Sequence, residues 1–184
     1  MARMGYHHGD LKAVILEQAA TLVAERGADG ISLRELARAA GVSHAAPAHH
    51  FTDRRGLFTA LATEGFRLLT DALTEARPQF IDAAKAYVRF ALDHPGHYEV
   101  MFDKSLYDDT DAELVAASTA AGAELNRGVG TLADPKAKAD PANSALAAWS
   151  LVHGFAQLWL NGAIDTTGDP VETVARLGQI LFDG

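Results

Sequence analysis

The segment from Ser32 to Leu57, SLRELARAAGVSHAAPAHHFTDRRGL, constrains the fold more than any other part of the chain. Ser32 followed by Glu35 is a capping box, in which both side chains satisfy backbone groups at a helix start. Gly41 is predicted to end this helix, because glycine tolerates the left-handed backbone of a tight exit. Ser43 is predicted to cap a second short helix. Two short helices joined by a glycine turn indicate a helix-turn-helix and therefore DNA.

The second helix of this pair is predicted to be exposed, because it holds no large apolar side chain before Phe51. Pro47 falls in or near its first turn, where a missing N–H costs least. The other positions of the helix are small or polar: His44, Ala45, Ala46, Ala48, His49 and His50. Such a helix is suited to the major groove of DNA, which is wide enough to admit it.

Net charge alone argues against a nucleic-acid partner, since the 184-residue chain carries a formal charge of -8. The distribution of charge changes this conclusion. Residues 1–58 hold seven Lys or Arg against six Asp or Glu, whereas the remainder holds nine against eighteen. Five of the eight histidines also lie in residues 1–58. We therefore expect an acidic body that binds DNA through its near-neutral, histidine-rich head alone.

The hydrophobic pattern indicates an all-α fold, with no strand-like alternation of any length. Apolar residues at 3,4 spacing predict a first helix that ends at Arg26 and Gly27, so that the head is a three-helix domain. A long helix is expected after a cap at Thr52 or Asp53 and should run to about Ala76.

Further helices are expected over residues 79–93, in a short stretch after His94 and Pro95, and over residues 109–130. Residues 131–140 read as a loop. The last two helices have clear start signals, because Asp140 and Asp169 each precede a proline at the first helical position. Glu172 is predicted to complete a capping box in the last helix.

Residues 142–164 contain no formally charged side chain. An uncharged helix of this length is long enough to span a bilayer. Polar residues scattered around it and the absence of basic flanks favour a buried helix instead. It is apolar on two faces, so that one face is left for a partner. Together with the last helix it predicts a two-fold, four-helix interface in a homodimer, formed by Val152, Phe155, Trp159, Val171, Val174, Leu177, Gly178 and Leu181.

At this point the chain resembles the TetR-type transcriptional repressors. The stretch SLRELARAAGVSHAAPAHHF followed by DRRGLF is similar to the DNA-binding signature of that family over roughly residues 10–58. Trp149 with His153 and Gly154, and the opening YHHGDL at residues 6–11, resemble the branch named for a tryptophan and a His-Gly pair. The resemblance implies an all-helical homodimer. It implies a DNA-binding domain over residues 1–55 and a six-helix ligand-binding and dimerisation domain over residues 56–184.

The same resemblance implies repression of a palindromic operator, from which a small-molecule effector releases the protein. The candidate DNA contacts are Ser32, Arg34, His44, Ala45, Ala46, His49, His50 and Arg54. Ala48 departs from the family pattern, which usually has a tyrosine there, and puts operator affinity in doubt. If His44, His49 or His50 contacts phosphate, operator affinity is expected to increase as the pH falls from about 8 to about 6.

Structural alternatives stand beside these interpretations. Arg34 and Arg38 are also compatible with solvated helix surface. His49 and His50 are poor metal chelators, since neighbours on a helix point about 100° apart, and we expect no cofactor. Residues 6–8 read either as a disordered arm or as a contact to the minor groove or the backbone. His153 reads either as a hydrogen-bonded core histidine or as a pocket residue.

Aromatic and polar residues of the body form a pool from which a minority should line an effector pocket: Phe90, Tyr98, Met101, Phe102, Tyr107, Trp149, His153 and Gln157. The chain contains none of the metalloprotease, nucleophile-elbow or P-loop motifs, so we do not expect an enzyme. The amino terminus has no apolar export segment, which predicts a cytoplasmic protein. The alternative function is a helical ligand-binding or interaction protein whose head has lost DNA binding.

Overall fold

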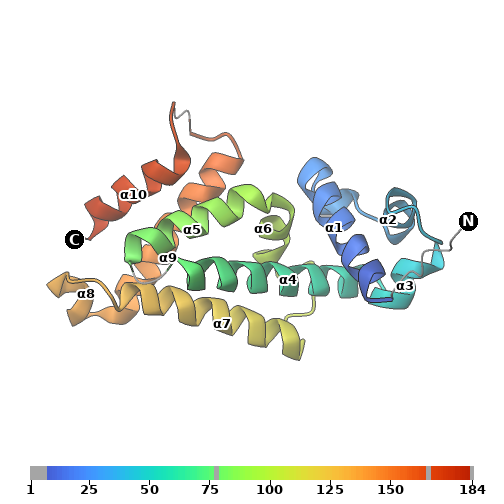
Figure 1. Ribbon diagram of the computed structural model, residues 1–184, viewed down its shortest axis with the longest axis horizontal. Helices are drawn as coiled ribbons and strands as arrows, with labels where there is room; N and C mark the ends of the chain where they lie inside the picture. Colours follow the sequence, from blue (N-terminus) through green and yellow to red (C-terminus); the bar gives the residue numbers. More distant parts are fainter. Residues whose placement is uncertain (1–7, 77–78, 165–166, 183–184) are drawn as a thin grey trace, which may run out of the picture. The chain divides into compact units, whose positions relative to one another are not determined.

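The computed structural model describes residues 8–76, 79–164 and 167–182, and all its regular elements are helices, which confirms the all-α fold (Figure 1). The elements are α1 (His8–Arg26), the 3-10 helix η1 (Ala28–Gly30), α2 (Leu33–Ala39), α3 (Ala45–Phe51), α4 (Arg54–Glu75), α5 (Phe80–Asp93), α6 (Pro95–Met101), α7 (Ala112–Val129), α8 (Pro135–Ala139), α9 (Pro141–Leu160) and α10 (Pro170–Leu181).

Most of the predicted start signals act as expected. The Ser32 hydroxyl accepts a hydrogen bond from the Glu35 N–H, as predicted, whereas the Glu35 carboxylate accepts from that hydroxyl at 2.9 Å and not from the backbone N–H that a capping box predicts. Asp53 caps α4, because its carboxylate accepts the N–H of Gly56 at 2.8 Å. The other two predicted caps, Asp140 and Asp169, accept backbone N–H groups at the starts of α9 and α10.

Three local predictions need correction. His44 occupies the N-cap position of α3 in place of Ser43, and its side chain makes no capping bond among the described contacts. The expected loop over residues 131–140 contains the one-turn helix α8, whose start is capped by Asp134. As a result, the segment after the head has one helix more than the six expected. Glu172 forms an ion pair with Lys85 at 2.9 Å, so that its carboxylate serves packing between α10 and α5.

The described residues form two compact units that are not consecutive in sequence. The head unit comprises the chain up to Gly65 together with residues 94–115, and the body unit comprises residues 66–93 with the chain from Ala116 onward. The expected domain boundary between residues 55 and 56 falls just inside α4. The division into a DNA-binding domain and a ligand-binding domain at that point stays a prediction.

The head unit is built around α1, whose Ile15, Ala19 and Val23 are fully buried. The α6 helix packs on α1 so closely that a Cβ at Gly96 would lie 2.0 Å from the backbone oxygen of Ala20. Such a contact admits only glycine, because two helix backbones meet there without a side chain between them. The α6 segment is therefore part of the head unit, although it lies far from the first helices in sequence.

The body unit is built from α5, α9 and α10, which pack against one another, and from α7 and α8. Phe80 on α5 meets Phe182 edge to face, with ring centroids 5.2 Å apart. Val174 on α10 is fully buried, and Gly178 lets α10 approach Ile81 of α5. Among the helices of the described residues, none combines the length and the apolar character that crossing a bilayer requires.

Candidate nucleic-acid interface

The helix-turn-helix has one buried side and one exposed side. Leu36 and Ala37 of α2 are fully buried, and Pro47 and Phe51 anchor α3. The predicted contact residues lie mostly on the other side: Ser32, Arg34, His44, Ala45 and His49 are exposed, and Ala46 and His50 are half-buried. The α2–α3 pair thus has a solvent-facing surface of small and basic side chains, as the sequence predicts.

The end of α3 is held by ring contacts. The ring centroids of His49 and His50 lie 5.6 Å apart at an interplanar angle of 69°, so the two imidazoles point in different directions. His50 lies against Phe51, whose ring also receives the ammonium of Lys12 on α1 at 5.9 Å. His49 is therefore the more accessible of the two histidines. Among the described residues, no three His, Asp or Glu side chains come together to hold a metal ion.

Arg54, the last of the predicted DNA contacts, is half-buried: 41% of its side chain is exposed, while two of its nitrogens contact backbone oxygens of the head unit. Its Nη2 donates to the backbone oxygen of Ala28 at 2.8 Å, and its Nε donates to that of Ile31 at 3.1 Å. The guanidinium also lies over the ring of Phe58, 4.7 Å from its centroid. Two of the three guanidinium nitrogens are therefore engaged inside the head unit. The sequence analysis missed this role, because nothing local to Arg54 indicates which carbonyl groups it meets.

The connection between α3 and α4 is a tight turn. Thr52 has φ 66° and ψ -59°, and the N–H of Asp53 donates to the backbone oxygen of Phe51 at 2.7 Å. A γ-turn of this kind is rare, and a β-branched residue seldom adopts a positive φ. Gly56 makes the turn possible, since a Cβ there would lie 2.0 Å from the Phe51 oxygen. The exit from α3 is thus strained and closely defined.

The predicted pocket residues are divided between the two units. Four lie in the head unit, and of these Tyr98, Met101 and Tyr107 are buried while Phe102 is half-buried. The Tyr107 hydroxyl donates to the backbone oxygen of Met101 at 3.0 Å, which is a core contact. The other four lie in the body unit: Phe90 is buried, Trp149 and Gln157 are exposed, and His153 is half-buried.

Trp149 and His153 meet at the hydroxyl of Tyr87, a fully buried residue that the sequence analysis did not select. The Tyr87 oxygen lies 3.0 Å from His153 Nδ1 and accepts the Trp149 Nε1–H at 3.4 Å. All three groups are satisfied when the hydroxyl donates to a neutral imidazole, because the indole N–H can only donate. Burial lowers the pKa of His153, which favours that neutral form. The bond to Tyr87 agrees with the hydrogen-bonded interpretation of His153, and a role in a pocket stays a prediction.

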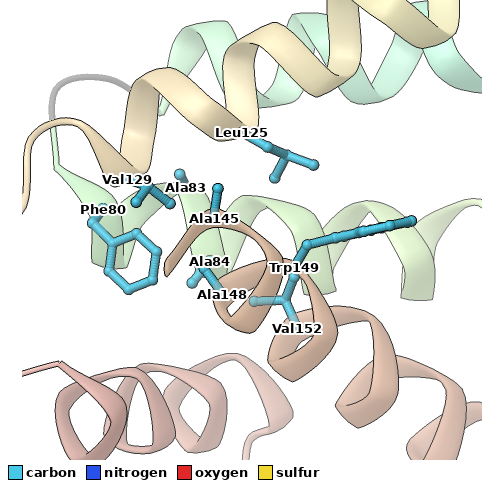
Figure 2. A pocket seen from close by; sticks show the side chains of 9 residues that line it. All are labelled: Phe80, Ala83, Ala84, Leu125, Val129, Ala145, Ala148, Trp149 and Val152. Atoms are coloured by element: carbon cyan, nitrogen blue, oxygen red, sulfur yellow. The ribbon is translucent and has the colours of Figure 1, made fainter. Parts of the chain in front are cut away.

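A pocket does lie in the body unit, and four of its nine lining residues are alanine. Figure 2 shows its side chains converging from α5, α7 and α9. The lining residues are Phe80, Ala83, Ala84, Leu125, Val129, Ala145, Ala148, Trp149 and Val152, and the cavity that they enclose is small, about 20 Å³, with further space open to solvent. Trp149 is the one predicted pocket residue among these lining residues. The sequence signal for this pocket is a pair of alanines on each of two helices, Ala83 and Ala84 on α5 and Ala145 and Ala148 on α9.

The predicted interface residues of α9 and α10 lie largely in the core of the body unit. Val152, Phe155, Val171, Val174 and Gly178 are buried within the chain itself, whereas Leu181 is exposed and Trp159 and Leu177 are half-buried. The exposed apolar residues of the two helices are different ones, namely Leu146, Leu158 and Ile180, together with Leu181.

Comparison with known proteins places these observations in a family. A model described as "Bacterial regulatory proteins, tetR family" matches residues 15–61, which include α2 and α3. A second model, described as "Tetracyclin repressor-like, C-terminal domain", matches residues 80–180, more than half of the chain.

The chain is also similar to individual proteins. It is 34% identical over 87 residues to the HTH-type transcriptional repressor AcnR of Corynebacterium glutamicum, a match that covers 47% of this chain and 43% of that protein. A protein of unknown function from Rhodococcus sp. RHA1 has a similar structure, with a TM-score of 0.74, 37% identity and coverage of 97% of this chain and 96% of that one.

A second similar structure is AibR in complex with isovaleryl coenzyme A and operator DNA, with a TM-score of 0.68 and 21% identity. The match covers 94% of this chain and 98% of that one. At this level of identity the likeness concerns the fold alone.

Proposed function

Because this chain belongs to the tetR family of bacterial regulatory proteins, we propose that it represses transcription by binding a palindromic operator as a homodimer, and that a small-molecule effector releases it. The single observation that carries the proposal is the exposed α2–α3 surface, whose opposite side is anchored by Leu36 and Phe51. The proposal also assigns the chain to the branch marked by Trp149, His153 and Gly154, and it places the protein in the cytoplasm.

In this proposal α3 lies in the major groove and α2 borders it. His44 and His49 read base edges, and Ala45 and Ala46 contact thymine methyl groups. Ser32, Arg34 and His50 contact phosphate or the groove edge. The assignment is supported by the exposure of Ser32, Arg34, His44, Ala45 and His49, while Ala46 and His50 are half-buried. Ala48 is exposed as well and is too short to take the place of the usual tyrosine, so we expect the flanking histidines to contribute more of the specificity.

Selection from a random DNA pool tests this proposal. We expect the purified protein to enrich an inverted repeat with half-sites one helical turn apart, about 34–36 Å. On the selected DNA, Arg34→Gln should weaken binding and reduce the salt slope by about one if Arg34 contacts phosphate. Arg89→Gln in α5 of the body unit is the matched control and should bind normally. Failure to enrich any sequence would support the alternative, a helical ligand-binding or interaction protein with a degenerate head, which the loss of the tyrosine favours.

We further propose that the homodimer forms through α9 and α10. On α9, Leu146, Ser150, Gly154 and Leu158 recur at four-residue spacing, so they share one face of the helix. A Cβ at Gly154 would meet no described atom within 4 Å, so the middle of this face is open to a close partner. Ile180 on α10, 80% exposed, adds a large apolar side chain. The occupant is a second copy of the chain, in keeping with the two-fold symmetry that a palindromic operator requires.

Sedimentation measures this interface directly. We expect Leu158→Arg and Ile180→Arg each to shift the protein from dimer to monomer, because a charge would be buried without a partner. Val115→Arg is the control, since Val115 is also a large exposed apolar residue, 46% exposed, but belongs to α7. If both α9 and α10 variants stay dimeric, the interface lies elsewhere.

We propose that the effector is a small, largely apolar molecule and that it binds in the alanine-walled pocket between α5, α7 and α9. The lining side chains are hydrocarbon apart from the indole of Trp149, so a charged group would be left without a partner there. AibR, which shares the fold, has been crystallised with both an acyl coenzyme A and operator DNA, so a branched acyl group is a sensible first probe.

Release of operator DNA by three small uncharged probes, isovaleramide, 3-methylbutan-1-ol and indole, tests the effector class. We expect the best of these to raise the dissociation constant for the selected DNA, and Ala148→Leu to abolish the effect by filling the pocket. The same variant should bind DNA normally in the absence of the probe. If Ala148→Leu responds as the unmodified chain does, the effector binds elsewhere.

A further inference from the structure

The peptide groups of Ala28 form the junction between α1 and the helix-turn-helix. Gly27 leaves α1 with φ 77° and ψ 159°, a backbone conformation that turns the chain sharply away from the helix axis. Ala28 itself is buried, and η1 carries the chain to Ile31, directly before the cap of α2. The direction in which α2 starts therefore depends on how this short junction is held.

The junction is held on its N–H side by α6. Glu99 Oε1 accepts the N–H of Ala28 at 2.7 Å, and a Cβ at Gly27 would lie 3.6 Å from the same oxygen. The carboxylate is aimed by the close packing of α6 on α1, because Gly96, one helical turn earlier, lies against the Ala20 oxygen. A charge-assisted bond of this kind is among the stronger hydrogen bonds in proteins.

The junction is held on its carbonyl side by α4. Arg54 donates to the oxygens of both Ala28 and Ile31, so that its planar guanidinium spans the whole of η1. The ring of Phe58, one turn further along α4, supports the guanidinium from one face. Asp29 lies 3.8 Å from Arg54 but is fully exposed, so water screens that ion pair. The two directed carbonyl bonds are the substantial contacts.

We propose that Glu99 and Arg54 are positioning residues for DNA binding, which hold opposite sides of the Ala28 junction and thereby set the pose of α2 and α3 relative to α1. Arg54 acts through the backbone that it fixes and is not a phosphate contact, although its place at the start of α4 indicates one. The inference rests on the proposed DNA-binding function. It predicts that operator affinity depends on Glu99, an acidic residue that would repel DNA if it acted directly.

The first test compares Glu99→Ala with Glu99→Gln on the selected operator. Both variants remove the negative charge, but glutamine keeps an oxygen that accepts the Ala28 N–H. We expect Glu99→Ala to weaken binding about tenfold and Glu99→Gln to stay within about twofold of the unmodified chain. The salt slope should be unchanged in both, since no phosphate contact is lost. Equal affinities for the two variants would overturn the proposal for Glu99.

The second test distinguishes positioning by Arg54 from contact with phosphate. Arg54→Lys keeps the charge but cannot donate two bonds in the same fork geometry. We expect about tenfold weaker binding by Arg54→Lys. Arg54→Gln removes the charge and should also leave the salt slope unchanged, whereas Arg34→Gln should lower it by about one. Normal operator binding by Arg54→Lys, or a lower slope in Arg54→Gln, would overturn the assignment of Arg54.

Amide hydrogen exchange of the free protein separates this inference from the proposed function, because it requires no DNA. We expect Glu99→Ala to speed exchange of the Ala28 amide at least tenfold while amides in the middle of α1 and α4 keep their protection. Glu99→Gln should restore slow exchange. Unchanged protection of Ala28 in Glu99→Ala would overturn the inference even if the chain binds its operator. Failure of the unmodified chain to bind any DNA, with Ala28 behaving as expected, would overturn the proposed function and the DNA-positioning role together, leaving only the junction contact.

Discussion

The head and body units are both helical, but different interactions define their geometry. In the head unit, charged or polar side chains fix particular backbone groups: Ser32 at the start of α2, Asp53 at the start of α4, and Arg54 and Glu99 around Ala28. In the body unit, apolar side chains such as Phe80, Phe182 and Val174 pack together, and large apolar residues remain exposed on α9 and α10.

This difference corresponds to what each unit has to present. A DNA-reading surface needs defined helix directions, and directed hydrogen bonds to the backbone supply them. A surface for a second chain or a small ligand needs apolar area and space, which non-directional packing supplies. We therefore expect the head unit to tolerate less change in backbone geometry than the body unit does.

The largest effect is expected from Gly96→Ala in the head unit. The new methyl group would lie 2.0 Å from the Ala20 oxygen, and both groups belong to helix backbones that cannot move aside separately. We expect the free energy of unfolding to fall by about 3 kcal/mol, measured by urea denaturation. Gly122→Ala is the control, because a Cβ there would meet no described atom within 4 Å. It should raise stability by about 0.5–1 kcal/mol through helix propensity. Similar effects at both glycines would contradict the comparison.

The next effect concerns the polar cluster of the body unit that Tyr87, Trp149 and His153 form. Tyr87→Phe removes the hydroxyl that His153 and Trp149 share. We expect the free energy of unfolding to fall by about 1–2 kcal/mol, because a half-buried imidazole nitrogen loses its partner. His153→Gln keeps an acceptor for the hydroxyl and should cost less. If Tyr87→Phe is as stable as the unmodified chain, apolar packing alone defines this part of the body unit.

A smaller effect, of opposite sign, is expected at the γ-turn of the head unit. Thr52→Gly relieves a positive φ of 66°, but it also gives the unfolded chain more freedom. We expect a net gain of about 0.5 kcal/mol in a thermal or urea unfolding experiment. Gly41→Ala is the reverse control, since Gly41 has the same φ and open space around it. It should lose about 1 kcal/mol. A loss of stability in Thr52→Gly would mean that the threonine side chain contributes more than its backbone strain costs.

The smallest effect is a dependence of stability on pH from His153. Burial holds the pKa of His153 below its ordinary value in the folded chain, so the unfolded chain takes up the proton first as pH falls. The contribution of His153 to the free energy of unfolding is therefore complete above the ordinary histidine pKa, and it is lost as the pH falls below that value. We expect unfolding between about pH 7.5 and about pH 5.5 to be less pH-dependent in His153→Gln than in the unmodified chain. Identical profiles would show that His153 carries no such coupling.

Local signals predicted most of the fold. Caps such as Ser32, Asp140 and Asp169 act within a few residues of themselves, so they can be read from the sequence and are confirmed in the structure. The start of α3 was predicted one residue too early, at Ser43, because cap-forming residue types also occur just outside helices. The short α8 was missed because a single turn shows no periodicity.

The site was less predictable, because its contacts join residues that are distant in sequence. The exposed side of α3 follows from small and polar residues that cannot form a core, and it was predicted correctly. The backbone contacts of Arg54 depend on carbonyl groups at Ala28 and Ile31, more than 20 residues away. The apolar residues of α9 and α10 indicate that both helices pack against something. Which of these residues lie in the chain's own core and which stay exposed depends on where α5 lies, and the sequence does not show that.

The alanine walls of the body pocket bear on how a regulator of this kind can change over generations. Ala83, Ala84, Ala145 and Ala148 face a shared space, and a single base change converts an alanine codon to one for valine. The volume offered to a guest molecule can therefore be reduced in small steps. None of these positions takes part in the polar contacts around α2 and α3, so under the proposed function the effector preference can change without altering the DNA-binding surface.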